Sequence, residues 1–412
     1  MTPPDTTKIE TQSHPHERPW LFGLLIAPEA VISIGLVSGA LAYLMRNEGV
    51  DPARAASLVA LLSLPHAIYF LWGPLTDFWL GRRTWLIAAA LASASILLVA
   101  FHQPRLGSDF AVALLFLSAC LGVLVAAACG GMLGTLHSEK ARRRGGSFYQ
   151  GGSLAIGGIA VYLLVSLAAR VSIGTLGWIV ATMIVLPSLA ALAAPQQETV
   201  TKSGRKETFA RIWQEFQGTF FRWEAIPYTL LITFPMCSGA MIGLLPELAR
   251  DYSVTGQQVA WINGVAGALL MTAGALAASL IPVHVKAPIA YLSAGLVNAA
   301  TLALLALGPQ LPAVYFAATV LYLFTIGACY ALFTAVLLEF LGRSGKSGSS
   351  RYALINSLGN LPVAYVAYLD GRAYAHWGPR AMPAADAALS AMGALMLLAY
   401  FVFRRRNARD RD

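Results

Sequence analysis

Long apolar runs separated by short polar loops dominate the chain from Trp20 onward. An α-helix needs about 20 mostly apolar residues to cross the bilayer core, which is about 30 Å thick. The runs are continuous and lack the short alternating segments of a membrane β-barrel. The pattern therefore predicts an all-α membrane protein with twelve transmembrane helices. The expected spans are residues 20–45, 55–75, 84–102, 110–136, 147–169, 173–193, 227–246, 259–281, 287–307, 312–339, 350–369 and 382–403.

The composition agrees with this pattern and excludes several other classes of protein. Hydrophobic residues make up 57% of the chain and charged residues only 12%, whereas ordinary soluble domains carry about 25% charged residues. Too few charges are present to cover a water-facing surface of this size. A soluble enzyme, a disordered chain and a disulfide scaffold are therefore excluded.

The basic residues are distributed unevenly among the loops. Of the 29 Lys and Arg, 22 lie in the two termini and in the loops on the same side, and seven lie in the opposite loops. Loops rich in Lys and Arg stay in the cytoplasm, so both termini are expected to be cytoplasmic. The net charge of +9 is then a signal of topology, and no nucleic-acid partner is expected.

The longest loop, residues 194–226, divides the chain into two halves. Phe209, Trp213, Phe216 and Phe220 recur in it at helical spacing, which predicts an amphipathic helix in the cytoplasmic membrane interface. The alternative is a plain linker. The expected organisation is a cytoplasmic tail (1–19), a six-helix bundle (20–193), the cytoplasmic linker (194–226), a second six-helix bundle (227–403) and a basic cytoplasmic tail (404–412).

The two halves show a weak internal repeat. A displacement of 204 residues aligns Gly35 with Gly239 and Arg46 with Arg250. Two parallel six-helix repeats are the architecture of major facilitator transporters. We therefore expect the major facilitator fold.

A motif at the end of the second span also resembles this family. The residues that carry it are Gly73, Asp77, Gly81, Arg82 and Arg83. The major facilitator signature joins helices 2 and 3 at the cytoplasmic face. This chain departs from it, because Gly81 lies four residues after Asp77 instead of three, and Phe78 replaces the usual basic residue. An aspartate here can sit against helix N-termini and arginines and hold the bundle in one state. The alternative is a generic turn with positive-inside arginines.

Two further segments resemble the peptide/acetyl-CoA transporter branch, which includes muropeptide permeases of the AmpG type. They are residues 64–77, which contain Leu-Pro-His and Trp-Gly-Pro-Leu-Thr-Asp, and residues 352–362 in the eleventh span. Muropeptide permeases carry acidic residues in helix 4, where this chain has only small residues at 126–131. The substrate of that branch is therefore not carried over.

Two ionisable groups at membrane depth are candidates for proton coupling. Glu29 lies in the first span and His66 in the second, and each follows a proline. Intramembrane ionisable residues are costly and commonly functional, and a proline loosens a helix locally. Glu29 is expected to carry the coupled proton, with His66 as a relay or a substrate contact. The alternatives are a structural hydrogen bond, or a position of Glu29 near the interface.

The second half offers polar candidates for the substrate cavity. They can equally serve as hydrogen bonds between helices. With no deep Lys or Arg, a neutral or amphipathic solute is favoured. The candidates are Asn263, Asn298, Tyr322, Tyr330, Asn356 and Asn360.

These observations predict a secondary active transporter that moves a small solute by alternating access. Proton-coupled import is favoured, because the fifth span lacks the Gly-Pro motif that efflux pumps of the superfamily usually carry. The alternatives are a proton-driven efflux antiporter, a lipid flippase or a non-transporting sensor. An enzyme is not expected, since no metal-ligand cluster or nucleophile–base pair is present, and neither a metal nor a cofactor is expected. The expected partners are a small-molecule substrate, protons and the bilayer, with the protein a monomer in a bacterial inner membrane.

Overall fold

The computed structural model describes residues 18–50, 52–194, 214, 217, 226–341 and 348–409. Across these ranges the chain forms helices and connecting turns and no strand. The amphipathic helix predicted in the linker and most of both tails lie outside the described residues. The last helix, α18 (Ala381–Arg409), continues into the region expected as a C-terminal tail.

Nine helices within the described ranges are long and apolar enough to cross a membrane. Each coincides with one of the predicted spans. The remaining predicted spans, the second, seventh and eleventh, contain helices that are interrupted. The twelve-span count and the cytoplasmic side of the termini stay predictions. The nine helices are Ala27–Asn47, Arg82–Phe101, Asp109–Leu133, Glu139–Leu167, Ile173–Ala193, Gly256–Leu280, Ala287–Leu307, Pro312–Leu341 and Ala381–Tyr400.

The interruptions fall next to prolines and glycines, which weaken or end a helix. In the second span the α-helix ends soon after Pro65, and in the eleventh it breaks between Gly359 and Pro362. The second span consists of α4 (Pro52–Ile68), η2 (Tyr69–Leu71) and η3 (Gly73–Asp77). The seventh consists of α10 (Ile226–Thr233) and α11 (Ala240–Leu248), and the eleventh of α16 (Gly348–Gly359) and α17 (Leu361–Trp377).

The first span is helical throughout but changes its winding. The short helices α1 (Leu21–Leu25) and α2 (Ala27–Ala30) lead into η1 (Val31–Ala40), a π-helix, and then α3 (Leu41–Asn47). Wide π turns are rare and occur frequently at functional sites. Glu29 lies directly before this π segment.

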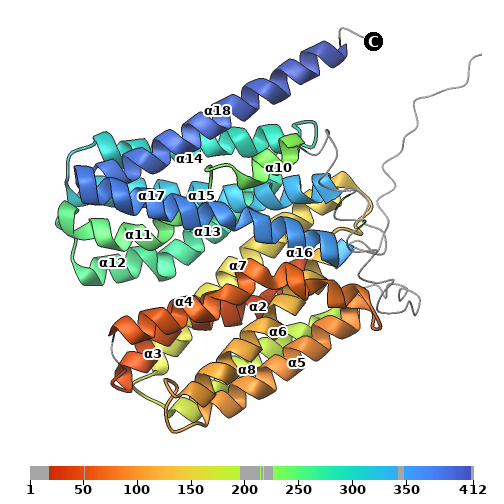
Figure 1. Ribbon diagram of the computed structural model, residues 1–412, viewed down its shortest axis with the longest axis vertical. Helices are drawn as coiled ribbons and strands as arrows, with labels where there is room; N and C mark the ends of the chain where they lie inside the picture. Colours follow the sequence, from red (N-terminus) through yellow and green to blue (C-terminus); the bar gives the residue numbers. More distant parts are fainter. Residues whose placement is uncertain are drawn as a thin grey trace, which may run out of the picture.

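The helices before residue 194, here the N-terminal half, and those after residue 226, the C-terminal half, form two lobes (Figure 1). One large hydrophobic cluster lies mainly in the N-terminal half and a second mainly in the C-terminal half. The halves contact each other through α7 (Glu139–Leu167), which packs on α13 (Val265–Ala277) and α15 (Pro312–Leu341). At one end α16 also packs on α6 (Asp109–Leu133) and η3.

Candidate functional site

A cavity of about 570 Å³ lies between the two halves. Five of the residues predicted to act in coupling or substrate binding line it: Glu29, His66, Tyr330, Asn356 and Asn360. Its walls come from the first, second, fourth and fifth spans of the N-terminal half, and from the interrupted seventh span, α14 (Ala287–Leu307), α15, α16 and α17 of the C-terminal half. A cavity that both halves line is a place where one solute can contact both at once.

Glu29 and His66 contact each other in the wall of this cavity. Glu29 Oε1 lies 2.9 Å from His66 Nε2, and Glu29 is only 8% exposed. Glu29 comes from α2, and His66 lies near the end of α4, beside Pro65. The sequence showed no cationic partner for either group, because helix packing, and not sequence spacing, brings them together. A carboxylate and an imidazole at this distance can hold a proton between them.

Amide side chains extend the polar wall and bridge the two halves. Asn360 Nδ2 donates a hydrogen bond to the backbone oxygen of His66 at 3.3 Å. Gln150 Nε2 donates to Thr334 Oγ1 at 2.9 Å. Among the described residues that line the cavity, none is Lys or Arg. The wall can therefore make directional hydrogen bonds, but it offers no fixed positive charge to an anionic group.

The other three predicted cavity residues lie behind the wall. Asn263 Nδ2 donates to Tyr315 Oη at 3.0 Å, and Asn298 Nδ2 donates to Thr325 Oγ1 at 2.8 Å. Tyr322 is 1% exposed and, like these two asparagines, does not line the cavity. The two asparagines make the hydrogen bonds between helices that were the alternative interpretation.

The seventh span is unwound beside the cavity, between α10 and α11. Residues 234–239 are not helical, and both Cys237 and Gly239 have positive φ, at 50° and 77°. Met236, Cys237 and Ser238 line the cavity. The sequence predicted one continuous span here. Pro235 and Gly239 were the signal in the sequence for this interruption. A proline removes a helical hydrogen bond and a glycine permits non-helical backbone angles.

Side chains from three other helices replace the missing helical hydrogen bonds of this segment. Tyr365 Oη donates to the Thr233 oxygen at 2.6 Å, and Tyr291 Oη donates to the Met236 oxygen at 3.2 Å. Ser390 Oγ lies 3.3 Å from the Pro235 oxygen. Unwound backbone is tolerated at membrane depth only where such partners exist or where it lines a cavity.

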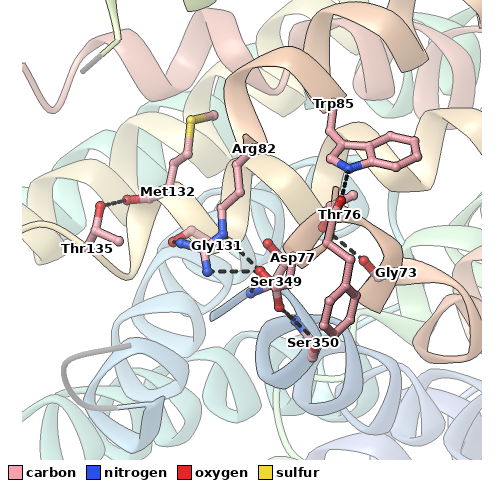
Figure 2. Close-up of polar contacts among 11 residues, drawn as sticks. Gly73, Thr76, Asp77, Arg82, Trp85, Gly131, Met132, Thr135, Ser349 and Ser350 are labelled. Atoms are coloured by element: carbon pink, nitrogen blue, oxygen red, sulfur yellow. Dashed lines mark hydrogen bonds and ion pairs between the residues drawn. The ribbon is translucent and has the colours of Figure 1, made fainter. Parts of the chain in front are cut away.

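At one end of the molecule, Asp77 joins the two halves (Figure 2). Arg82 donates to Asp77 Oδ1 through Nε and Nη2, at 3.0 and 2.9 Å. From the other half, the Ser349 amide donates to Oδ1 at 3.2 Å, and the amide and hydroxyl of Ser350 donate to Oδ2, each at 2.8 Å. Asp77 and Arg82 are 5% and 8% exposed. The carboxylate thus caps the N-terminus of α16, where helix amides and the helix dipole favour a negative charge.

Small residues allow α16 to approach this closely. A Cβ at Gly130 would overlap the Tyr352 ring, and one at Gly131 would overlap the Ser349 hydroxyl. A Cβ at Gly73 would lie 2.8 Å from the Ala353 Cβ, closer than any relaxed contact. The small residues at 126–131, which distinguish this chain from muropeptide permeases, therefore include the surface on which α16 docks.

The remaining motif residues have different places. Gly81 is the N-cap residue of α5 (Arg82–Phe101), with an extended backbone. The Arg82 guanidinium also donates through Nη1 to the Gly131 oxygen at 3.1 Å. The half-buried Arg83 side chain makes no hydrogen bond or ion pair to a described residue. Buried Tyr69 and Tyr149 line the cavity, and buried Tyr352 of α16 lies edge-on to the Tyr149 ring.

Two solved transporters share the fold of this chain. The human organic anion transporter MFSD10 (TETRAN) superposes with a TM-score of 0.69 at 16% identity, over 92% of this chain and 98% of that one. The proton:xylose symporter XylE superposes with a TM-score of 0.65 at 15% identity, over 93% and 94%. A comparison with curated proteins finds no significant match.

At these identities the solved structures establish the fold alone. The sequence profile described as Major Facilitator Superfamily matches residues 30–365, most of the chain. Members of this family are transporters embedded in membranes by multiple helices, as the apolar helices here require. The chain therefore belongs to the major facilitator superfamily.

Proposed function

We propose that this protein is a proton-coupled importer of a neutral or amphipathic polar solute, with Glu29 and His66 as the coupling pair. The observation that carries the proposal is the 2.9 Å contact between their side chains in the wall of the central cavity. A carboxylate and an imidazole in direct contact can share one proton. Because both line the cavity, the pair is placed to exchange that proton with water there.

The wall of the cavity supports a solute without strong negative charge. Its described residues supply amides, hydroxyls and aromatic rings, and no Lys or Arg. Binding sites of this kind orient a ligand by a few hydrogen bonds within a mostly apolar pocket. One structural neighbour is a proton symporter of a sugar and the other an organic anion transporter. The chemistry of the cavity favours the first kind of substrate. The resemblance to the peptide/acetyl-CoA branch stays a prediction.

The contacts of Asp77 support a conformation closed at the end where α16 docks. With both termini in the cytoplasm, as the basic loops predict, this closed end faces the cytoplasm and the cavity belongs to an outward-facing state. Alternating access then requires α16 to leave Asp77 while the halves rock about the cavity. An efflux antiporter would use the same two states in the opposite order.

The substrate can be found and the coupling tested with purified protein. A thermal-shift screen against neutral sugars, peptides and muropeptides identifies a stabilising ligand. Uptake of that ligand is then measured in proteoliposomes with and without an imposed proton gradient, together with counterflow, which needs no gradient. Glu29→Gln is expected to abolish gradient-driven accumulation and to retain counterflow.

Glu48→Gln is the matched control, because Glu48 also belongs to the N-terminal half but does not line the cavity and accepts a hydrogen bond from the Leu106 amide. It is expected to accumulate substrate as the parent does. If Glu29→Gln accumulates substrate with the same dependence on the gradient, Glu29 does not carry the proton. Gradient-driven exit of the ligand from the proteoliposomes would instead favour the antiporter.

A further inference from the structure

Two buried aspartates lie in the C-terminal half, outside the cavity. Asp370 of α17 is 0% exposed and Asp386 of α18 is 3% exposed. Asp386 lies five residues into α18, about 7.5 Å along the helix at 1.5 Å per residue. The helices α17 and α18 pack against each other, and the two carboxyl groups are close enough to interact electrostatically.

The hydrogen bonding of this pair is incomplete. Ser390 Oγ donates to Asp386 Oδ1 at 2.9 Å. Neither carboxyl oxygen of Asp370 has a hydrogen-bond partner among the described residues. The buried hydroxyl of Tyr322, which interacts electrostatically with Asp386, has no partner there either. A buried carboxyl pair with so few hydrogen bonds is a place where a positive charge or a proton would be stabilised.

The groups that face the pair supply no such charge. Within the described part of the chain, neither aspartate forms an ion pair with Lys, Arg or His. Arg372 of α17 lies on an exposed face, beside Tyr368 and His376. The titratable groups that interact with Asp386 are Tyr322 and Tyr330 of α15 and Cys237 of the unwound segment. Asp251 accepts from Tyr374, and Arg380, just before α18, is exposed and donates to the Gly308 oxygen.

Burying an ionised carboxylate without a partner costs several kcal/mol of free energy, and two ionised carboxylates side by side also repel each other. A proton removes both penalties and needs no coordination shell. We propose that Asp370 and Asp386 form a second proton-binding site, in the C-terminal half and separate from Glu29. The site takes one proton from water and returns it to water, and it does not depend on Glu29 being the coupling residue.

Ser390 links this site to the unwound seventh span. Its single hydroxyl hydrogen has two acceptors within reach, Asp386 Oδ1 and the Pro235 oxygen. When Asp386 is ionised, the hydroxyl donates to the carboxylate, and the Pro235 oxygen loses its donor. When Asp386 is protonated, it donates to Ser390 Oγ, and the hydroxyl turns to Pro235. Binding of the proton therefore tightens the wall of the cavity at residues 234–239.

Infrared spectroscopy of the purified full-length protein in lipid tests the site without a substrate. At pH 6 exposed aspartates, which titrate near pH 4, no longer contribute to the carbonyl stretch of protonated acids. A buried acid still does. We expect such a band in the parent, a shifted band in Asp370→Asn or Asp386→Asn, where one buried acid remains, and its loss in the double variant. Glu29→Gln and Asp109→Asn, the latter on a fully exposed side chain, should keep it.

Three results would overturn the proposal. The first is a band that is unchanged in the double variant while its thermal unfolding matches that of the parent. The second is loss of the parent's band on replacing choline by Na⁺, since the site would then hold a metal cation. The third is loss of the band in Glu29→Gln alone, which would assign the protonated acid to the central cavity. That outcome would overturn the second site but not the proposal of proton-coupled uptake.

The link through Ser390 has its own readout, the rate at which a maleimide labels Cys237 with the other three cysteines replaced by serine. At a pH above that at which the infrared band of the parent disappears, Asp386→Asn should slow labelling several-fold, because the amide donates to Ser390 as the protonated acid does. In a Ser390→Ala background the same substitution should change nothing. Equal slowing in both backgrounds would show that Ser390 is not the link.

Discussion

At the scale of single residues, Asp77 is the most heavily bonded carboxylate described in the structure. Its two oxygens accept from Arg82 of its own half and from the first turn of α16 in the other half. Both charges are buried, so removing one leaves the other without compensation. A buried pair broken in this way costs about 3–5 kcal/mol.

The Arg82 pair lies within one half, so its loss acts on both states alike, and the shift comes from the bonds to α16. Asp77→Asn weakens these charge-assisted hydrogen bonds and is expected to shift the protein away from the state closed at this end, by about 2 kcal/mol or roughly 30-fold in the equilibrium. Labelling of a cysteine introduced at Ser349 with a membrane-impermeant reagent, applied from that side, measures the shift. Asp109→Asn is the control, because the Arg54–Asp109 pair is exposed and exposed pairs contribute little. Unchanged labelling in Asp77→Asn would mean that Asp77 does not hold the halves together.

The sequence identified individual residues better than their partners. Glu29 and His66 stood out because ionisable groups at mid-span are rare, but their mutual contact depends on how the first two spans pack. Asp370 and Asp386 did not stand out, because each lies near the end of a predicted span, where an acidic residue is ordinary. Only the burial of both side chains shows that they are unusual.

At the scale of helices, irregular segments gather around the cavity. The π-helix η1, the end of α4 at Ile68, the unwound residues 234–239 and the break at Asn360 all adjoin it. The internal repeat aligns Gly35, inside η1, with Gly239, at the end of the unwound segment. The first span of each half is thus irregular at a corresponding position.

Gly239→Ala tests the unwound segment. A residue other than glycine at φ 77° is strained by about 1–2 kcal/mol, and the new Cβ would also overlap the Tyr330 hydroxyl. We expect lower thermal stability and loss of the cavity ligand's stabilising effect. Gly243→Ala, in the following helix and with nothing within 4 Å of the new Cβ, should be neutral or stabilising by up to about 1 kcal/mol. Equal effects of both substitutions would contradict this.

The apolar runs located the nine long apolar helices of the described residues, most of them to within a few residues, because the bilayer demands apolar length whatever the tertiary structure. The helix of the fifth span is the exception, since α7 begins at Glu139, well before its predicted span. The apolar runs did not locate the interruptions. A span remains apolar when its backbone unwinds, provided that side chains such as Tyr291 and Tyr365 supply the lost hydrogen bonds. Those donors come from other helices, and their approach is a property of the packing.

At the scale of the whole molecule, the two halves meet along α7 and at α16. In the outward-facing state proposed above, the contacts near the start of α7 belong to the closed end. A Cβ at Gly146 of α7 would lie 3.5 Å from the Cβ of Thr334 of α15. This separation suits a disulfide.

The double substitution Gly146→Cys with Thr334→Cys, with the four native cysteines replaced, is expected to form a disulfide between the halves. Oxidation should stop transport and reduction should restore it, because a rocking motion has to separate these positions. Gly146→Cys alone should transport under both conditions. Full transport by the oxidised double variant, with the crosslink verified by mass spectrometry, would exclude separation of α7 and α15 at this point.

The buried contact between Asp77 and the N-terminus of α16 also ties opening to the uptake of water. When this end opens, water must replace the hydrogen bonds that the carboxylate, the Arg82 guanidinium and the freed amides of α16 now make with one another. Every opening therefore withdraws a fixed quantity of water from the adjoining compartment. Turnover is expected to fall as an impermeant osmolyte concentrates on that side, at constant substrate and pH, so that transport responds to osmotic pressure.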